Sequence, residues 1–108
     1  MNRFLSIILY LILSIHHLSG KNYHYAYTQL SISEGLSQAN VESILLDQRG
    51  DLWIGTKNGL NHYSQQQMEN YFHQMEDIHS LPNSRVLQLE EDSLGNIWVG
   101  TINGLAQY

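Results

Sequence analysis

The 108-residue sequence predicts an all-β fold, with about two four-stranded β-propeller blades (an incomplete propeller) after an N-terminal signal helix. Three observations predict it. A motif of 23 residues occurs twice at a fixed offset, each copy divides into short strand-like runs separated by turn residues, and an apolar run of 12 residues opens the chain. A strand-rich unit that recurs every 40 to 50 residues or so is typical of propeller blades.

The two copies of the motif span residues 41–63 and 86–108, so they are offset by 45 residues and align without a gap. Ten of the 23 positions are identical. The identical pairs are Val41/Val86, Asp47/Asp92, Gly50/Gly95, Trp53/Trp98, Gly55/Gly100, Thr56/Thr101, Asn58/Asn103, Gly59/Gly104, Leu60/Leu105 and Tyr63/Tyr108. This repetition predicts two copies of one supersecondary unit, with a two-repeat sandwich or a small hairpin protein as the alternative architecture.

Each copy of the motif predicts three strands. Val41–Leu46 is rich in branched residues and precedes a turn at 47–50, where Asp can cap its own backbone and Gly accepts a positive φ. Asp51–Thr56 is a nearly continuous apolar run, as in a strand covered on both faces. Asn58-Gly59 is a strong hairpin signal, and it introduces a short strand at Leu60–Tyr63.

Two further strands are predicted outside the motif. Met68–Gln74 contains adjacent aromatic residues and would be the fourth strand of the first blade. In Tyr23–Leu30 the tyrosines alternate, which predicts a strand with one aromatic face and suggests the equivalent strand of a preceding unit. The single proline, Pro82, falls in a predicted loop at 77–84, where no ladder hydrogen bond is lost.

The first 20 residues predict a signal peptide. Arg3 supplies a positive start, and Phe4–Ile15 is apolar but shorter than the ~20 residues that a membrane-spanning helix needs. We expect cleavage after Gly20, which leaves residues 21–108 as two propeller repeats in the periplasm or another extracytoplasmic space. A buried core helix and an uncleaved anchor are the alternatives for this run.

The composition excludes several classes of function. The net charge is −5, and the chain has no cluster of basic residues, so it should not bind nucleic acid through phosphates. No basic amphipathic stretch is present, so we expect no direct membrane binding after removal of the signal. The absence of cysteine excludes disulfides, thiolate chemistry and cysteine-based zinc sites.

The motif, from Asp47 through Trp53-Ile-Gly-Thr56 and Gly59-Leu60 to Tyr63, resembles the two-component regulator propeller repeat, as does its copy from Asp92 to Tyr108. The flanking Glu34-Gly-Leu-Ser37 resembles the lead-in segment of that family, with Glu in place of Asp, and His79-Ser-Leu-Pro-Asn83 resembles its inter-blade segment. The resemblance implies the periplasmic sensor region of a hybrid histidine kinase, here its N-terminal part. It also implies that the kinase lies in domains absent from this chain, and that the partners are further blades and a glycan or other small extracellular ligand.

Two sets of motif residues allow a ligand-binding interpretation beside a structural one. Trp53 and Trp98 could stack on sugars, but each lies within an apolar strand, which favours packing between blades. Asp47 and Asp92 could suggest calcium, but the spacing of an EF-hand loop is not met, so we favour turn capping. The Gly-Thr pairs lack the lysine of a P-loop and are expected to allow close packing.

No nucleophile–base pair, metal-ligand spacing or cofactor motif is found in the sequence, and the six histidines form no set. We therefore predict a non-enzymatic chain with no cofactor, either a sensor's binding module or a structural interaction module. The predicted motif residues are structural: Asp47, Gly50, Trp53, Gly55, Thr56, Gly59, Leu60, Asp92, Gly95, Trp98, Gly100, Thr101, Gly104 and Leu105. Two blades leave two apolar faces uncovered, so the isolated chain is expected to be oligomeric, aggregated or partly unfolded.

Overall fold

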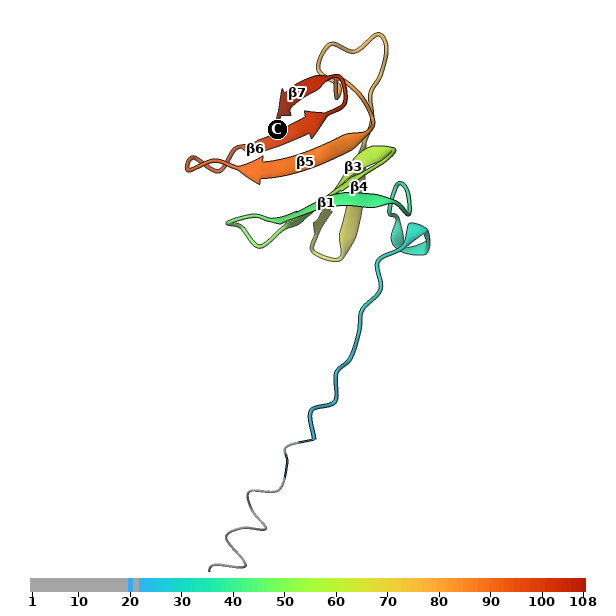
Figure 1. Cartoon of the computed structure of the whole chain (residues 1–108), viewed down its shortest axis with the longest axis vertical. Helices are drawn as coiled ribbons and strands as arrows, with labels where there is room; N and C mark the ends of the chain where they lie inside the picture. The colour runs from blue at the N-terminus through green and yellow to red at the C-terminus, as the bar shows by residue number, and fades with distance from the viewer. Residues whose placement is uncertain (1–19, 21) are drawn as a thin grey trace, which may run out of the picture.

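The computed structural model describes residue 20 and residues 22–108, which form two antiparallel sheets stacked face to face (Figure 1). The predicted signal peptide falls almost entirely outside the described residues. A 3-10 turn, η1 (Ile32–Glu34), precedes the first sheet. The first sheet contains β1 (Val41–Leu46), β2 (Leu52–Thr56), β3 (Gly59–Ser64) and β4 (Gln67–Tyr71), in that order. The second sheet contains β5 (Val86–Glu91), β6 (Ile97–Thr101) and β7 (Gly104–Gln107).

The all-β fold and the position of each motif strand are as predicted. Each unit is a meander in which consecutive strands pair, and both units share the same register: Trp53 lies between Leu45 and His62, and Trp98 lies between Glu90 and Gln107. The fourth strand is shorter than predicted and ends at Tyr71 rather than at residue 74. The second sheet has three strands instead of four among the described residues.

The strand predicted at Tyr23–Leu30 is wrong for the single chain. This segment is extended but pairs with no strand in the described part of the chain. Its tyrosines at 23, 25 and 27 are 71%, 79% and 94% exposed. An alternating pattern identifies the face that a strand would present, but a strand also requires a neighbouring backbone, and none of the described residues supplies one here. No helix of the described residues is long and apolar enough to cross a membrane.

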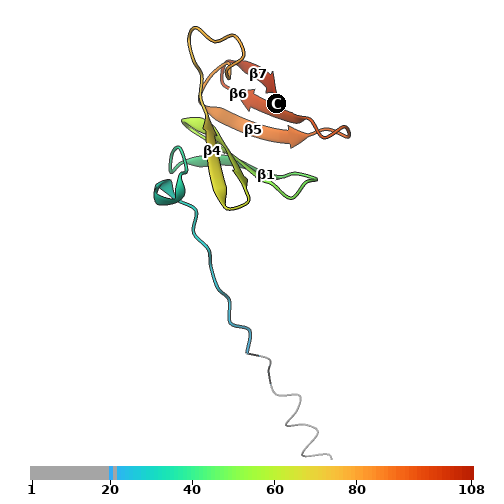
Figure 2. The same cartoon turned by 180° about the vertical axis from the view of Figure 1, so that it is seen from behind.

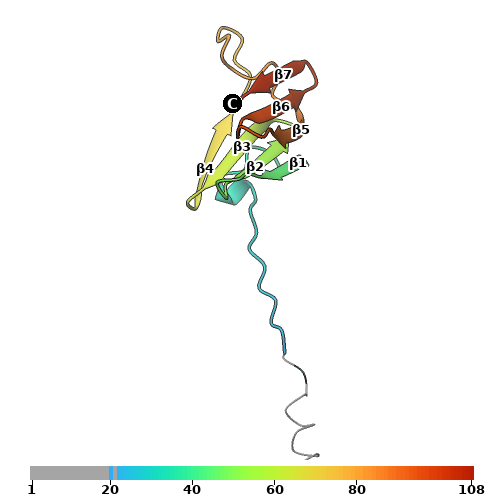
Figure 3. The ribbon, with the colours of Figure 1, turned by 90° about the vertical axis from the view of Figure 1, so that its left-hand side faces the viewer.

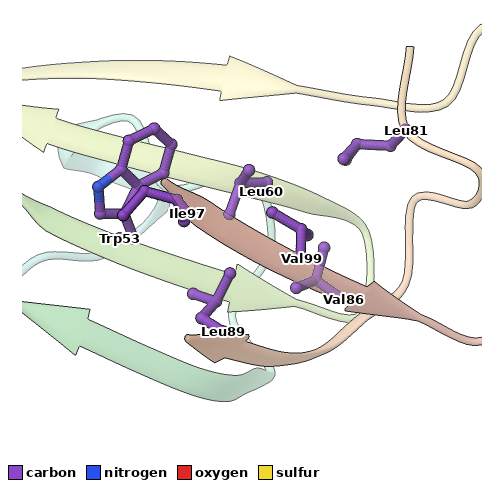
Figure 4. Close-up of a cluster of buried hydrophobic side chains, with 7 residues drawn as sticks. All are labelled: Trp53, Leu60, Leu81, Val86, Leu89, Ile97 and Val99. Atoms are coloured by element: carbon purple, nitrogen blue, oxygen red, sulfur yellow. The ribbon is translucent and has the colours of Figure 1, made fainter. Parts of the chain in front are cut away.

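The hydrophobic core lies between the two sheets (Figure 4). Its members are Trp53, Leu60, Leu81, Val86, Leu89, Ile97 and Val99, with Leu45, Tyr71 and Ala106 packed against them. In the first sheet these residues come from one face of β1 to β4, and in the second sheet from the opposite face. Figures 2 and 3 show the same stack from behind and from the side, with β5 lying beside β1.

A polar network fastens the segment before β1 to the other face of the first sheet. Asn61, which is fully buried, accepts a hydrogen bond from the Ser37 amide at 2.9 Å and donates from Nδ2 to the Ser37 hydroxyl at 2.9 Å. The same amide group donates to the Ile54 carbonyl at 3.0 Å. Leu36, 5% exposed, is thereby held on this face. In the second sheet Ala106 occupies the position of Asn61, so this network is not repeated.

Candidate functional site

The interface between the sheets is centred on Trp53, which is 2% exposed. The indole stacks on the His62 ring with centroids 4.0 Å apart, and the Tyr108 ring meets it edge-on at 4.7 Å. The structure therefore places Trp53 in the core, where a sugar could reach its ring only if the sheets separated. Trp98, at the same position of the second sheet, is half-buried because its face carries no third sheet in the described part of the chain.

Both motif aspartates satisfy a turn and a tryptophan at once. Asp47 accepts hydrogen bonds at 2.9 Å from the amides of Arg49 and Asp51, and at 2.8 Å from the indole N–H of Trp53. Asp92 accepts equivalent bonds from Leu94, Asn96 and Trp98. Gly50 and Gly95, with φ of 87° and 86°, close the two turns in a conformation that side chains rarely adopt. The Asp-x-x-Gly-x-x-Trp spacing is thus a hydrogen-bonding unit, which explains why all three residues recur together.

This arrangement predicts a dependence of stability on pH. Hydrogen bonds from Asn96 and from the Trp98 indole lower the pKa of Asp92 from 3.8 to about 2. Because the folded state favours the ionised carboxylate, its contribution to the free energy of unfolding is complete above about pH 4 and is lost as pH falls toward 2. The urea midpoint of unfolding, measured from pH 7 down to pH 2, should fall over this window. Asp92→Asn should flatten part of the fall, whereas equal pH profiles for both proteins would contradict this role of Asp92.

One group of titratable side chains could in principle hold a metal ion. Ligand atoms of Asp47, Asp51 and His62 lie within 4.8 Å of one another. However, Asp51 accepts hydrogen bonds from the Ser64 hydroxyl at 2.8 Å and pairs with His62 Nε2 at 2.9 Å, and these contacts, Ser64 first, lower its pKa. The second repeat has Asn96 and Gln107 in place of Asp51 and His62. These neutral amides can take over the hydrogen bonds of an aspartate and a histidine, but they are weak ligands for cations. What the two repeats share at these positions is therefore hydrogen bonding, and the group in the first repeat gives no support to a metal site.

Gly55 lies where the sheets approach most closely. A β-carbon on this residue would come within 2.5 Å of the Val86 side chain, which is fully buried, and would also collide with the Ser43 hydroxyl. At Gly100, the equivalent residue, the nearest atom would be 3.6 Å away. The close-packing role predicted for the Gly-Thr pairs therefore depends on a neighbouring sheet.

Thr56 and Thr101 shape the hairpin that follows. The Thr56 hydroxyl donates to the Gly59 carbonyl at 2.9 Å and accepts from the backbone N–H of Asn58 at 3.1 Å. Thr101 makes the same pair of bonds, at 2.8 and 3.2 Å, with Gly104 and Asn103. This role of the two threonines was not predicted from the sequence, although the shared Thr-x-Asn-Gly spacing could have indicated it.

Polar contacts join the two sheets around the core. Arg85 and Glu42 form an ion pair at 2.9 Å, which lowers the pKa of the Glu42 carboxyl. The backbone N–H of Gln48 donates to the Glu91 carboxylate at 3.0 Å, and the backbone N–H of Gly59 donates to the Ser84 carbonyl at 2.5 Å. Neither the Arg85–Glu42 pair nor the contact of Gln48 with Glu91 was predictable from the sequence, because the partners are 43 residues apart and belong to different units.

The outer face of the second sheet is open. A shallow depression there is lined by Gln88, Glu90, Trp98, Gly100 and Leu105. One repeat earlier, the corresponding residues are Ser43, Leu45, Trp53, Gly55 and Leu60, which the second sheet covers. The second sheet thus presents the surface on which, in the first, a neighbouring sheet packs. Glu90 in place of Leu45 makes this surface more acidic.

Two known proteins resemble this chain, one in sequence and one in structure. Over 72 residues the chain is 39% identical to a protein named histidine kinase P4 from Formosa agariphila, and the match covers 67% of this chain but 5% of that protein. A crystal structure of the extracellular domain of a proposed hybrid two component system from B. thetaiotaomicron superimposes with a TM-score of 0.67 and 30% identity. That match covers 75% of this chain and 12% of the other.

The chain therefore spans only a small part of either relative. A sequence profile described as two component regulator propeller matches residues 35–58 and 80–103, two segments offset by the same 45 residues as the motif. Each matched segment contains the aspartate, the tryptophan, and the glycine and threonine whose contacts are described above. Residues 35–58 and 80–103 are two repeats of the two-component regulator propeller family.

Proposed function

We propose that this chain supplies blades to the extracytoplasmic sensor domain of a two-component regulatory system, and that it contributes to ligand recognition and signal input rather than to catalysis. The observation that carries the proposal is the interface around Trp53, whose first-sheet surface recurs on the open face of the second sheet. A repeated stacking surface suits a row of blades that continues beyond two. The likeness to an extracellular domain of a hybrid system supports an extracytoplasmic location.

The polar groups of the interface support a non-catalytic role. Asp47 and Asp92 receive hydrogen bonds from turn amides and indoles, and Asp51 and His62 are bonded to each other. Asp47, Asp51 and His62 line a small open pocket, but each is engaged in these hydrogen bonds rather than free as an acid or base. Their hydrogen bonds hold turns and strands in place, which is a structural role.

Sensing can be tested by transplanting the two repeats. Residues 31–108 would replace two consecutive repeats in the extracellular domain of the B. thetaiotaomicron system, and a kinase-dependent reporter would be measured with a panel of oligosaccharides. We expect the chimaera to respond with a changed ligand preference, and the same chimaera with Trp53→Ala to be silent. A folded chimaera whose preference and dose response equal those of the parent would show that the repeats do not recognise the ligand.

A folded chimaera with the ligand preference of the parent would favour a structural or protein-interaction module with no ligand of its own. One observation supports this alternative: β1 exposes Ile44 and Leu46, at 65% and 67%, on the face of the first sheet that points away from the second. Exposed apolar residues on one face of a sheet are typical of surfaces that bind another protein segment.

Export of the protein is a separate prediction. Arg3 and the apolar run Phe4–Ile15 predict transfer across the inner membrane and cleavage after Gly20. Cell fractionation with N-terminal sequencing should find the protein in the periplasm, beginning at or near Lys21. Arg3→Glu, which reverses the charge at the start of the signal, should reduce export. A soluble cytoplasmic protein that retains Met1 would contradict the prediction.

A further inference from the structure

We propose that Asn58 is a site of spontaneous covalent modification, and that the contact between the two sheets controls whether it reacts. The reaction is an attack by the backbone nitrogen of Gly59 on the side-chain amide of Asn58, which converts the asparagine to aspartate or isoaspartate. The contact blocks this attack while the sheets are stacked, and separation of the sheets permits it. The proposal concerns the chain itself and is independent of its role in sensing.

The reaction needs only the Asn58-Gly59 dipeptide and water. The Gly59 nitrogen loses its proton and bonds to Cγ of Asn58, and the side-chain nitrogen leaves as ammonia. A water molecule then opens the resulting five-membered imide at either of its carbonyls. Opening at Cγ gives aspartate, and opening at the backbone carbonyl gives isoaspartate, in which the main chain runs through the side-chain carbon. Glycine favours the attack because it has no β-carbon beside the nitrogen.

The side-chain amide of Asn58 is accessible. The residue is exposed in the hairpin that joins β2 to β3. Its backbone N–H is bonded to the Thr56 hydroxyl, but its side-chain amide has no hydrogen-bond partner among residues 22–108. An amide group with no such bond is free to turn toward a nucleophile, and water can reach the imide that forms. The electrophile of the reaction is therefore available in the folded chain.

The attacking nitrogen, by contrast, is held in place. The Gly59 N–H donates to the carbonyl of Ser84, in the segment that leads into β5, at 2.5 Å. Gly59 is buried, and a β-carbon built on it would lie 2.8 Å from the Phe72 ring and 2.9 Å from the Ser37 hydroxyl. The backbone therefore has no room to turn its nitrogen toward Asn58. Loss of the proton is also disfavoured, because a charge in a buried position is costly.

The bond that holds Gly59 crosses between the two units. Ser84 is followed by Arg85, which forms the ion pair with Glu42 across the same boundary. When the second sheet moves away from the first, the Ser84 carbonyl leaves with it, and the Gly59 nitrogen becomes free. Local openings of this kind need no more free energy than global unfolding. The rate of reaction at Asn58 in the folded protein therefore reports how often the two sheets separate.

Isoaspartate would make the separation permanent. Thr56 pairs with Gly59 at the end of the β2–β3 ladder, and its hydroxyl donates to the Gly59 carbonyl at 2.9 Å. Isoaspartate adds a carbon to the main chain just before Gly59, which would move this glycine out of line with both Thr56 and Ser84. A transient opening would thus become a lasting loss of contact between the sheets.

Peptide mass spectrometry measures the reaction directly. The exported, purified chain would be incubated at mildly alkaline pH, folded in buffer and unfolded in urea, and the peptide that contains Asn58 would be followed for conversion to aspartate and isoaspartate. We expect conversion in the folded chain to be at least about tenfold slower, which corresponds to an opening free energy of ~1.4 kcal/mol or more. Equal rates in the two conditions would overturn the proposal.

Variants of the junction test its control of the reaction. Gly55→Ala crowds the interface between the sheets, and Arg85→Gln removes the ion pair across it. Both should speed the conversion of Asn58 at least about threefold, because each lowers the free energy of opening. Gly100→Ala, at the same motif position of the second sheet, should leave the rate unchanged. If neither Gly55→Ala nor Arg85→Gln reacts faster than the wild type, the sheets do not control this site.

The lasting effect is tested on the product. The isoaspartate form, separated from the unmodified chain by chromatography, should unfold at a lower urea concentration. Asn58→Asp is the matched control, because it has the added carboxylate without the longer main chain, and it should unfold close to the wild type. An isoaspartate form as stable as Asn58→Asp would contradict the lasting loss of contact.

Discussion

Replacing Trp53 with alanine is expected to destabilise the folded chain by about 3–5 kcal/mol. The indole is 2% exposed, contacts aromatic rings of both sheets and donates a hydrogen bond to Asp47. Its removal leaves a cavity between the sheets and deprives the Asp47 carboxylate of a donor. Since small domains are stabilised by only about 5–15 kcal/mol, a loss of this size should lower the urea midpoint of unfolding strongly, as followed by circular dichroism.

Trp98→Ala is the matched control. It removes the same side chain from the same position of the motif and breaks the equivalent bond to Asp92, but from a half-buried site on an open face. We expect a clearly smaller loss of stability than for Trp53→Ala. Equal losses would mean that Trp98 is covered in solution, by a partner or by a second copy, and not exposed as in the single chain.

Gly55→Ala should separate the sheets although it adds only one methyl group. The new carbon would come within 2.5 Å of Val86, a β-branched side chain that is fully buried and has no room to rotate away. Overpacking of this kind costs about 1–3 kcal/mol. The expected result is a lower urea midpoint and increased binding of a dye that detects exposed apolar surface.

Gly100→Ala provides the comparison for this experiment. Its nearest neighbour would be 3.6 Å away, an ordinary van der Waals contact, so the isolated chain should tolerate the change. If Gly100→Ala is as damaging as Gly55→Ala, the glycines are required for strand geometry and not for the approach of a neighbouring sheet.

The sequence predicts most of the strands because each unit combines branched residues with turn residues at fixed positions. The second copy helps because it shows which of these residues recur and therefore belong to the pattern. Val41–Leu46 was predicted with the observed bounds, and Asp51–Thr56 to within one residue. By contrast, Tyr23–Leu30 has an equally regular pattern and forms no strand in the single chain. Periodicity reports which face of a segment is apolar, but pairing depends on a second backbone that a local pattern does not specify.

The contacts of the site were less predictable. The sequence indicated that Asp47 would cap a turn, but the bond from Trp53 to the other carboxylate oxygen depends on how β2 returns beside the turn. The pair formed by Arg85 and Glu42 depends on the stagger between two sheets, which no spacing within one unit encodes. Trp53 is buried and Trp98 only half-buried, and this difference likewise depends on which face of each sheet a neighbouring sheet covers.

The junction between the sheets also has a consequence for recombination between repeats. Packing residues such as Gly55 and Trp53 recur in the next unit, so any unit could stack on any other. The Arg85–Glu42 pair does not recur, because Asn40 and Leu87 stand at the positions one repeat away. Each junction can therefore carry its own charge pair on a common apolar surface, and such a pair would favour one order of the blades over another. A gene rearrangement that shuffled the units would keep their cohesion but lose this matching, which disfavours arrays assembled in the wrong sequence.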